Sequence, residues 1–219
     1  MIRRRFFGVL SVVAASLAVG GCKIVATPAR KAGGADEGNG GGFDPDAMVN
    51  AMWDAKVMPY LAAKAGALPD VTALVGSNPD EAGRKYGYRA KEGSEPWTFV
   101  VNIDGRIVSA ETTSRAATIS VDTKGDGKIA AVVQIGPAMR GTALRDSLDF
   151  VSFNDFKNQI DYAQFGKAFN QRVAKTILAQ LPRDSLVGRN VKILGAFTLE
   201  SGDRPPLVAP AQLTLGPAP

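Results

Sequence analysis

Residues 97–107 read WTFVVNIDGRI, and this stretch decides the fold. Every second position from Phe99 to Ile107 is apolar or glycine, which is the period of a half-buried β-strand. The apolar face continues without a break through Gly105. We therefore expect one long strand bent at that glycine, rather than a tight hairpin at Asp104-Gly105.

Four more segments show the same alternation further along the chain, at residues 117–121, 131–135, 191–199 and 207–215. Between the third and fourth of these five strands, an apolar side chain every four residues predicts a long helix, which Pro182 ends. The residues of this stripe are Phe165, Phe169, Val173, Ile177 and Leu181.

Three strands, a helix and two strands, with a long first strand bent at a glycine, is the order of the OB-fold, a five-stranded Greek-key barrel. The expected fold class is α+β, with a five-stranded OB-like antiparallel barrel over residues 97–215 and the long helix between its strands 3 and 4. An open antiparallel sheet packed on helices is the alternative.

The segment before the barrel has helical periodicity instead. Asp44-Pro45 and Asn78-Pro79 are typical helix starts, because a capping side chain precedes a proline in the first helical turn. Pro59 should kink or break the first helix. We expect residues 44–87 to form a helical preface that shares one globular domain, residues 44–219, with the barrel.

The N-terminus predicts export and lipid attachment. Three arginines at residues 3–5 precede an apolar stretch at residues 6–19, which is shorter than the roughly 20 residues needed to span a bilayer. The segment LAVGGC, residues 17–22, resembles the bacterial lipobox, in which the cysteine sulfur receives a diacylglyceryl group. We expect residues 1–21 to be a signal peptide and Cys22 to be lipidated.

The lipid would hold the chain on the periplasmic side of a membrane. Residues 22–43 are rich in glycine and charge and predict a flexible tether. Lys23 stands where an aspartate would favour the inner membrane, so the outer membrane is slightly favoured.

Composition excludes several classes of function. The chain has no histidine and one cysteine, which excludes Cys/His zinc sites, Ser-His-Asp triads and Cys-His dyads. We expect no metal, no cofactor and no enzymatic activity. From Cys22 on, 23 basic residues stand against 21 acidic ones, because three of the 26 basic residues precede it and no acidic residue does. That balance argues against a nucleic-acid partner.

Several motifs resemble the predicted periplasmic lipoproteins of domain-of-unknown-function family 2291. They are CKIV at 22–25, QIGP at 134–137, RGTALRD at 140–146 and FNDFKNQ at 153–159. The resemblance covers nearly the whole chain after the leader and implies no known activity. Members tend to be encoded beside sugar or polyol import systems, which implies a role near carbohydrate uptake.

The segment from residue 140 to 159 is the candidate ligand site. Amides, carboxylates and arginines alternate there with three phenylalanines, which suits a neutral polar ligand such as a sugar. The candidate residues are Arg140, Arg145, Asp146, Asn158 and Gln159. In the structural alternative, Asn154 or Asp155 caps the helix, Arg145 pairs with a carboxylate, and Phe150, Phe153 and Phe156 are core.

Residues 122–127, DTKGDG, partly match a calcium loop. Lys124 occupies a ligand position, so we expect a plain hairpin turn instead.

These observations predict a non-enzymatic accessory lipoprotein that binds a small polar solute or a transporter component. The rival is a structural or assembly factor that binds another envelope protein without a small ligand. A pocket lined by the candidate residues would favour the first. The same groups paired internally beneath a flat apolar patch would favour the second.

Overall fold

The computed structural model describes residues 42–91, 95–202 and 204–218. The expected signal peptide, Cys22 and nearly all of the expected tether lie outside these residues. The chain divides into two units after Gly42, and the fold described below is that of the second unit, which begins at Phe43. Within the described ranges, no helix is both long enough and apolar enough to cross a membrane.

Helix α1 (Pro45–Met52) begins where the sequence predicts, because the Asp44 carboxylate accepts a hydrogen bond from the Ala47 N–H at 2.9 Å. A π-helical turn, η1 (Trp53–Val57), leads into α2 (Met58–Lys64). Pro59 has no N–H to donate, and the wider turn before it closes with the Met58 N–H on the Trp53 carbonyl. The disturbance expected at Pro59 is this π-turn.

Helices α3 (Leu68–Ser77) and α4 (Pro79–Tyr86) complete the preface, and Asn78 caps α4. Two short strands that the sequence analysis missed join the preface to the barrel. β1 (Gly66–Ala67) pairs parallel, and β2 (Gly87–Tyr88) antiparallel, with the first barrel strand. Two residues are too few for a period-two pattern to be visible in a sequence.

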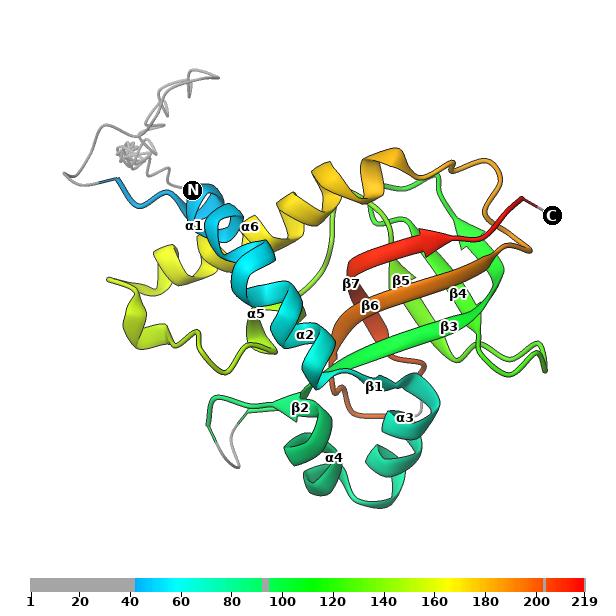
Figure 1. Cartoon of the computed structure of the whole chain (residues 1–219), viewed down its shortest axis with the longest axis horizontal. Coiled ribbons are helices and arrows are strands. Elements are labelled where there is room, and N and C mark those ends of the chain that lie inside the picture. Colours follow the sequence, from blue (N-terminus) through cyan, green and yellow to red (C-terminus); the bar gives the residue numbers. More distant parts are fainter. Residues whose placement is uncertain (1–41, 92–94, 203, 219) are drawn as a thin grey trace, which may run out of the picture. The chain divides into compact units, whose positions relative to one another are not determined.

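Five strands close into a ring (Figure 1): β3 (Thr98–Glu111), β4 (Thr118–Asp122), β5 (Ala131–Gln134), β6 (Asn190–Thr198) and β7 (Leu207–Leu215). The hydrogen-bonded order is β3-β4-β5-β7-β6, and β6 pairs again with β3. The first part of β3 pairs with β6 and its last part with β4. The predicted barrel is confirmed.

The long strand β3 runs unbroken through Gly105. A Cβ atom at this position would lie 2.4 Å from the Asp122 carbonyl oxygen and 2.9 Å from the Val121 side chain. A glycine is required because β4 crosses close to the backbone at the bend. The single bent strand is thus confirmed over the hairpin.

The barrel, which was expected to be antiparallel, contains one parallel pair. β5 and β7 run parallel, with Val132 opposite Leu207 and Val133 opposite Val208. A closed ring with an odd number of strands cannot alternate direction at every step, so at least one of its five pairs must be parallel. The other four pairs are antiparallel.

Helices α5 (Ala143–Asp146) and α6 (Gln159–Thr176) lie between β5 and β6, the third and fourth strands of the ring. Residues 112–117, which join β3 to β4, form no helix. The α6 side chains Phe165, Phe169 and Val173 are buried, and Trp53 packs on Phe169 with ring centroids 5.9 Å apart. Figure 1 shows α6 running beside the barrel, with α1 next to it.

The long helix was predicted to reach Leu181, and this is wrong by about a turn. α6 ends at Thr176, and a 3-10 turn, η3 (Leu178–Gln180), follows. Leu181 is extended, with ψ of 131°. The next residue is Pro182, whose ring disfavours helical geometry at the residue before it.

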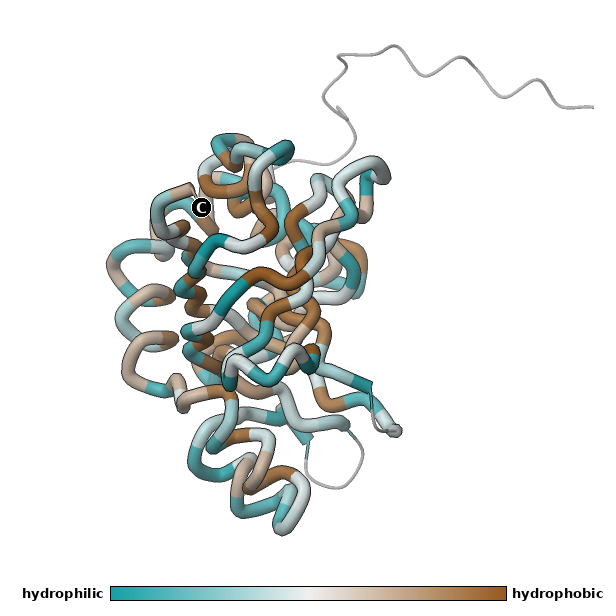
Figure 2. The backbone as a smooth tube through the Cα atoms, turned by 90° about the vertical axis from the view of Figure 1, so that its right-hand side faces the viewer, coloured by the Kyte–Doolittle hydropathy of each residue, from teal (hydrophilic) through white to brown (hydrophobic). Residues whose placement is uncertain are grey.

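One apolar core fills the barrel and continues between the barrel and the helices. Figure 2 shows the hydrophobic stretches running through the middle of the body, with hydrophilic stretches toward its rim. The outward-facing positions of the barrel strands are therefore free to carry polar side chains.

Candidate functional site

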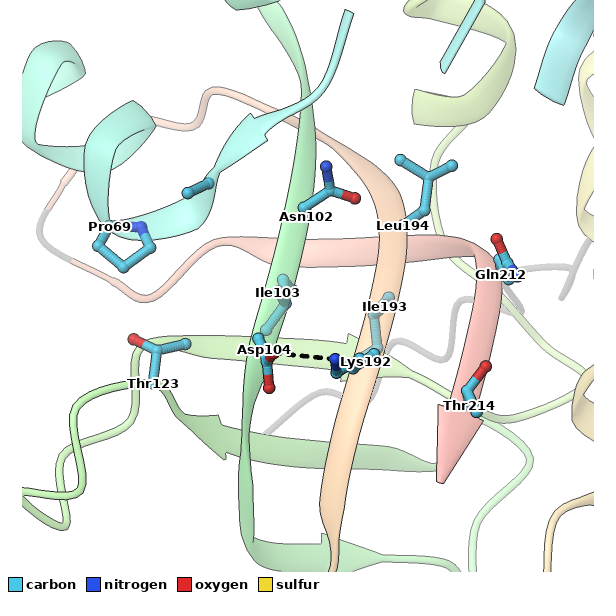
Figure 3. Close-up of a pocket in the computed structure, with 11 residues that line it drawn as sticks. Pro69, Asn102, Ile103, Asp104, Thr123, Lys192, Ile193, Leu194, Gln212 and Thr214 are labelled. Carbon is cyan, nitrogen blue, oxygen red and sulfur yellow. Dashed lines mark ion pairs between the residues drawn. The ribbon is translucent and has the colours of Figure 1, made fainter. Parts of the chain in front are cut away.

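A hollow of about 520 Å³ opens on the outer face of the barrel. Figure 3 shows it over β3, β6 and β7, next to the start of α3. Six polar side chains line it: Asn102, Asp104, Thr123, Lys192, Gln212 and Thr214. Ala67, Pro69 and Leu194 supply apolar surface.

The sheet register sets the strand residues of this hollow in two rows. Asn102 lies opposite Leu194, which lies opposite Gln212. The next row is Asp104, Lys192 and Thr214. Because side chains alternate across a strand, residues two apart on β3, β6 and β7 share the outer face. The sheet therefore holds these groups at fixed spacing.

The polar side chains that the three strands contribute to the hollow are exposed. The Asp104 carboxylate and Lys192 ammonium form an ion pair with Oδ2 and Nζ 3.5 Å apart, and both are largely exposed, so that solvent screens their attraction. Asn102, Gln212 and Thr214 are also exposed. The Thr123 hydroxyl oxygen is buried and has no hydrogen-bond partner within the described part of the chain.

The chemistry of this lining suits hydroxyl groups. Amides and hydroxyls both donate and accept hydrogen bonds, the carboxylate accepts them, and the ammonium donates them. A solute with many hydroxyls could pair with each, while Leu194 contacts its carbon skeleton. The volume of the hollow lies within the roughly 300–1,000 Å³ typical of small-molecule pockets.

Arg145 and Asp146, two of the sequence-predicted residues, belong to one hydrogen-bond network elsewhere. Arg145 is 9% exposed, and its Nε donates to Asp146 Oδ1 at 2.7 Å. Its Nη1 donates to the Tyr162 carbonyl at 3.0 Å and its Nη2 to Thr142 Oγ1 at 3.1 Å. The guanidinium also lies 3.7 Å from the centroid of the Tyr162 ring. Protein groups thus engage most of its donors.

The same two residues line a cavity of about 230 Å³, together with Arg89 and Tyr162. Burial raises the pKa of the Tyr162 hydroxyl above its ordinary value of 10; the charge of Arg145 opposes this rise and the charge of Asp146 adds to it. The phenol is therefore neutral at physiological pH. This cavity brings together two of the five predicted ligand residues.

The other three predicted residues lie apart from it. Asn158 caps α6, because its Oδ1 accepts from the Asp161 N–H at 2.9 Å. Gln159 is exposed on the first turn of α6, and the Arg140 side chain is exposed in the preceding loop. The main-chain N–H and carbonyl of Arg140 both bond to the Gln134 side chain, at 2.6 and 3.1 Å.

Two details of the structural alternative are wrong. Asn154 and Asp155 do not cap the long helix. They form a 3-10 turn, η2 (Phe153–Asp155), because Asp155 Oδ2 accepts from the Ser152 N–H at 2.8 Å and so closes a capping box of its own. Phe150 and Phe153 are 39% and 48% exposed rather than core, whereas Phe156 packs on Phe165 with centroids 5.0 Å apart.

The loop after β4 is a turn, as expected. The Asp122 carboxylate accepts hydrogen bonds from the main-chain N–H groups of Lys124, Gly125 and Gly127 at 2.8, 2.9 and 2.7 Å. These bonds lower the pKa of Asp122, and the bond from the Lys124 N–H has the largest effect. The carboxylate that would begin a calcium loop thus bonds to its own loop. Within the described ranges, no His, Cys, Asp and Glu side chains cluster in a way that could hold a metal ion.

Sequence reasoning missed the residues of the barrel hollow. Asn102, Asp104, Lys192, Gln212 and Thr214 occupy the polar positions of the alternating pattern, where any solvated strand face has such residues. The pattern marks each of them as outward-facing. Their convergence depends on strand register, which local sequence does not contain.

The model of a family of predicted periplasmic lipoproteins, DUF2291, matches residues 12–214. The chain belongs to this family. The family resemblance seen in the sequence is thereby confirmed, and the family description places this lipoprotein in the periplasm. No curated protein matches it.

Two solved structures match this lipoprotein with different strength. An OB-fold protein from Thermotoga maritima is 20% identical, with a TM-score of 0.63, over 80% of this chain and 100% of that one. An OBody bound to hen egg-white lysozyme is 16% identical, with a TM-score of 0.26, over 54% of this chain and 79% of that one. The first likeness supports the OB-fold.

Proposed function

We propose that this lipoprotein is a non-enzymatic binding protein that takes a small neutral polar solute, of the sugar or polyol class, into the barrel hollow of Figure 3. In this proposal Cys22 holds it by lipid to a membrane, and Lys23 favours the outer one. The protein then serves carbohydrate uptake as an accessory.

One observation carries the proposal. Exposed polar side chains from three neighbouring strands face the same hollow, and they include both hydrogen-bond donors and acceptors. A hydrogen-bonding site gains specificity when a ligand pairs its groups in a fixed geometry. Arg145 and Asp146 offer fewer open groups, since they already bond to each other and to Thr142.

The test is titration calorimetry with a panel of monosaccharides and polyols. We expect at least one to bind, and Asn102→Ala and Gln212→Ala to weaken it by about 0.5–1.5 kcal/mol each, the net worth of one hydrogen bond. The matched control is Asn190→Ala, which removes an exposed amide from β6 outside the hollow. All three variants should keep the melting temperature of the parent.

Equal affinity in parent, Asn102→Ala and Gln212→Ala would show that the ligand does not bind in this hollow. Loss of binding in Arg145 or Asp146 variants that still fold would assign the ligand to the cavity beside Tyr162. If no member of the panel binds, the proposed solute-binding function is rejected. The alternative, an assembly factor that binds another envelope protein, is then favoured.

A further inference from the structure

A second hollow, of about 500 Å³, adjoins the barrel hollow. Pro69 at the start of α3 and Thr123 after β4 line both of them, so the two hollows meet at these residues. Figure 3 shows both side chains at the side of the barrel hollow from which the loop after β4 leads away. We call the second one the loop hollow, because residues 122–124, 126 and 128–130 of that loop line it.

Hydrogen bonds hold the walls of the loop hollow in place. The three main-chain N–H groups that bond to the Asp122 carboxylate fix the loop between β4 and β5. The Ala130 N–H closes the same loop on the Val121 carbonyl at 2.8 Å. The Val132 N–H bonds to the carbonyl of Pro206, another lining residue, at 3.0 Å. The hollow is thus formed before a ligand arrives, which lowers the entropy cost of binding.

The lining of the loop hollow mixes polar and apolar groups, as that of the barrel hollow does. Thr72, Asp126 and Lys128 offer hydrogen-bond donors and acceptors. Ile129 and Pro205 supply apolar surface. Ile129 is 44% exposed, and a ligand that covers it removes apolar area from water. Hydroxyl groups on a carbon skeleton therefore suit this hollow too.

The charges of the loop hollow balance. Its charged lining residues are Lys124, Lys128, Arg204, Asp122 and Asp126. Arg204 has a carboxylate partner outside the lining, because its Nη2 lies 3.2 Å from Glu200 Oε2. With Glu200 counted, positive and negative groups are equal in number. The hollow therefore favours an uncharged ligand over an anion, which would need an excess of positive charge.

We propose that the solute is a linear, uncharged saccharide of at least two units, which binds one unit in the barrel hollow and continues past Pro69 and Thr123 into the loop hollow. A saccharide chain repeats its hydroxyls and its carbon skeleton at every unit, and this repetition matches two adjoining hollows of like chemistry. Each hollow is of a size typical for a small molecule. Since the chain starts in the barrel hollow, this proposal rests on the proposed function.

The test is titration calorimetry with saccharides of increasing length: glucose, maltose and maltotriose, followed by the cellobiose, mannobiose and xylobiose series. We expect at least one disaccharide to bind about tenfold tighter than its single sugar, because the second unit adds contacts in the loop hollow. Ile129→Ser and Lys128→Ala should remove this gain and leave the affinity for the single sugar unchanged, since both side chains line only the loop hollow. Asn102→Ala should weaken binding at every length.

Val187→Ser is the matched control for Ile129→Ser. Val187 is 53% exposed, in a loop, and is not a lining residue of either hollow, so its substitution should change neither affinity nor melting temperature. All the substituted side chains are exposed, so every variant should fold.

The outcomes separate this proposal from the proposed function. Single sugars that bind through Asn102, with no gain on lengthening, would overturn the saccharide chain and leave the proposed function intact. A gain that survives Ile129→Ser and Lys128→Ala would show that the chain leaves the barrel hollow by another path. Binding that depends on Ile129 and not on Asn102 would place the sugar in the loop hollow alone and overturn both. If no saccharide of any length binds, both are rejected.

Discussion

Substitutions of Asn158 can distinguish a structural role of this side chain from a role in ligand binding. Its Oδ1 caps α6, and its amide nitrogen lies 3.3 Å from Asp161 Oδ2. We expect Asn158→Ala to lower the free energy of unfolding by about 1 kcal/mol, because a main-chain N–H loses its partner. Asn158→Asp, which keeps a capping oxygen, should remain close to the parent in urea denaturation. An equally stable Asn158→Ala protein that has lost solute binding would instead support the ligand role predicted from the sequence.

Asp122 should make the fold sensitive to acid. Its pKa is lowered in the folded protein, chiefly by the Lys124 N–H, so this contribution to stability is full above the ordinary value of 3.8 and disappears as pH falls through the folded pKa. The melting temperature of the parent should therefore drop more steeply below that value than the melting temperature of Asp122→Asn. Asp126→Asn, in the same loop, is the control, because within the described part of the chain the Asp126 carboxylate accepts a single hydrogen bond, from the Lys128 N–H. Parallel pH profiles for parent and Asp122→Asn would refute this account.

Among the elements, the bend of β3 has a strict steric requirement, because it has no room for a side chain at Gly105. We expect Gly105→Ala to destabilise the protein by about 1–3 kcal/mol, since its Cβ would meet the Asp122 carbonyl and force β3 and β4 apart. The same substitution at Gly76, in α3, meets no atom within 4 Å and should stabilise by up to about 1 kcal/mol through helix propensity. Thermal denaturation of both variants gives the comparison. A neutral Gly105→Ala would mean that the strands separate there without cost.

The elements also show what sequence can and cannot predict. The five barrel strands were predictable because apolar residues alternate along each of them in the sequence. Burial follows this alternation only in part, because consecutive residues are buried at 98–101, 193–197 and 208–211. The end of α6 depended on the residue before Pro182, and the parallel pair β5–β7 depended on ring closure, which no single segment contains. Among the candidate residues, Arg145 was rightly expected to have a carboxylate partner. The barrel hollow was missed because its residues meet only through the register of three strands.

For the whole molecule, we expect removal of residues 23–42 to leave the melting temperature unchanged. Glycine, alanine and charged residues dominate this segment, and it offers little apolar area to bury. The folded unit begins at Phe43, whose ring should be retained because it packs on Phe156. A drop of many degrees would show that the deleted segment contributes to the fold.

The expected lipidation also concerns the whole molecule, and it can be tested by one substitution. Cys22→Ser removes the only sulfur that can accept a diacylglyceryl group. We expect this precursor to incorporate no labelled acyl chain and to stay unprocessed by the lipoprotein pathway, whereas its folded unit keeps the melting temperature of the parent. Acyl label retained in Cys22→Ser would contradict the lipobox assignment.

The closure of the ring has a consequence for the order of events in the cell. The Thr98 hydroxyl on β3 meets that of Thr198 on β6, 100 residues later. A ribosome completes the N-terminal part first, and pairings so distant in sequence form slowly. If residues 1–21 act as the expected signal peptide, the nascent chain lacks the strands that finish the barrel while that segment is already exposed. We then expect the precursor to cross the membrane before the ring closes, and ring closure to take place on the far side.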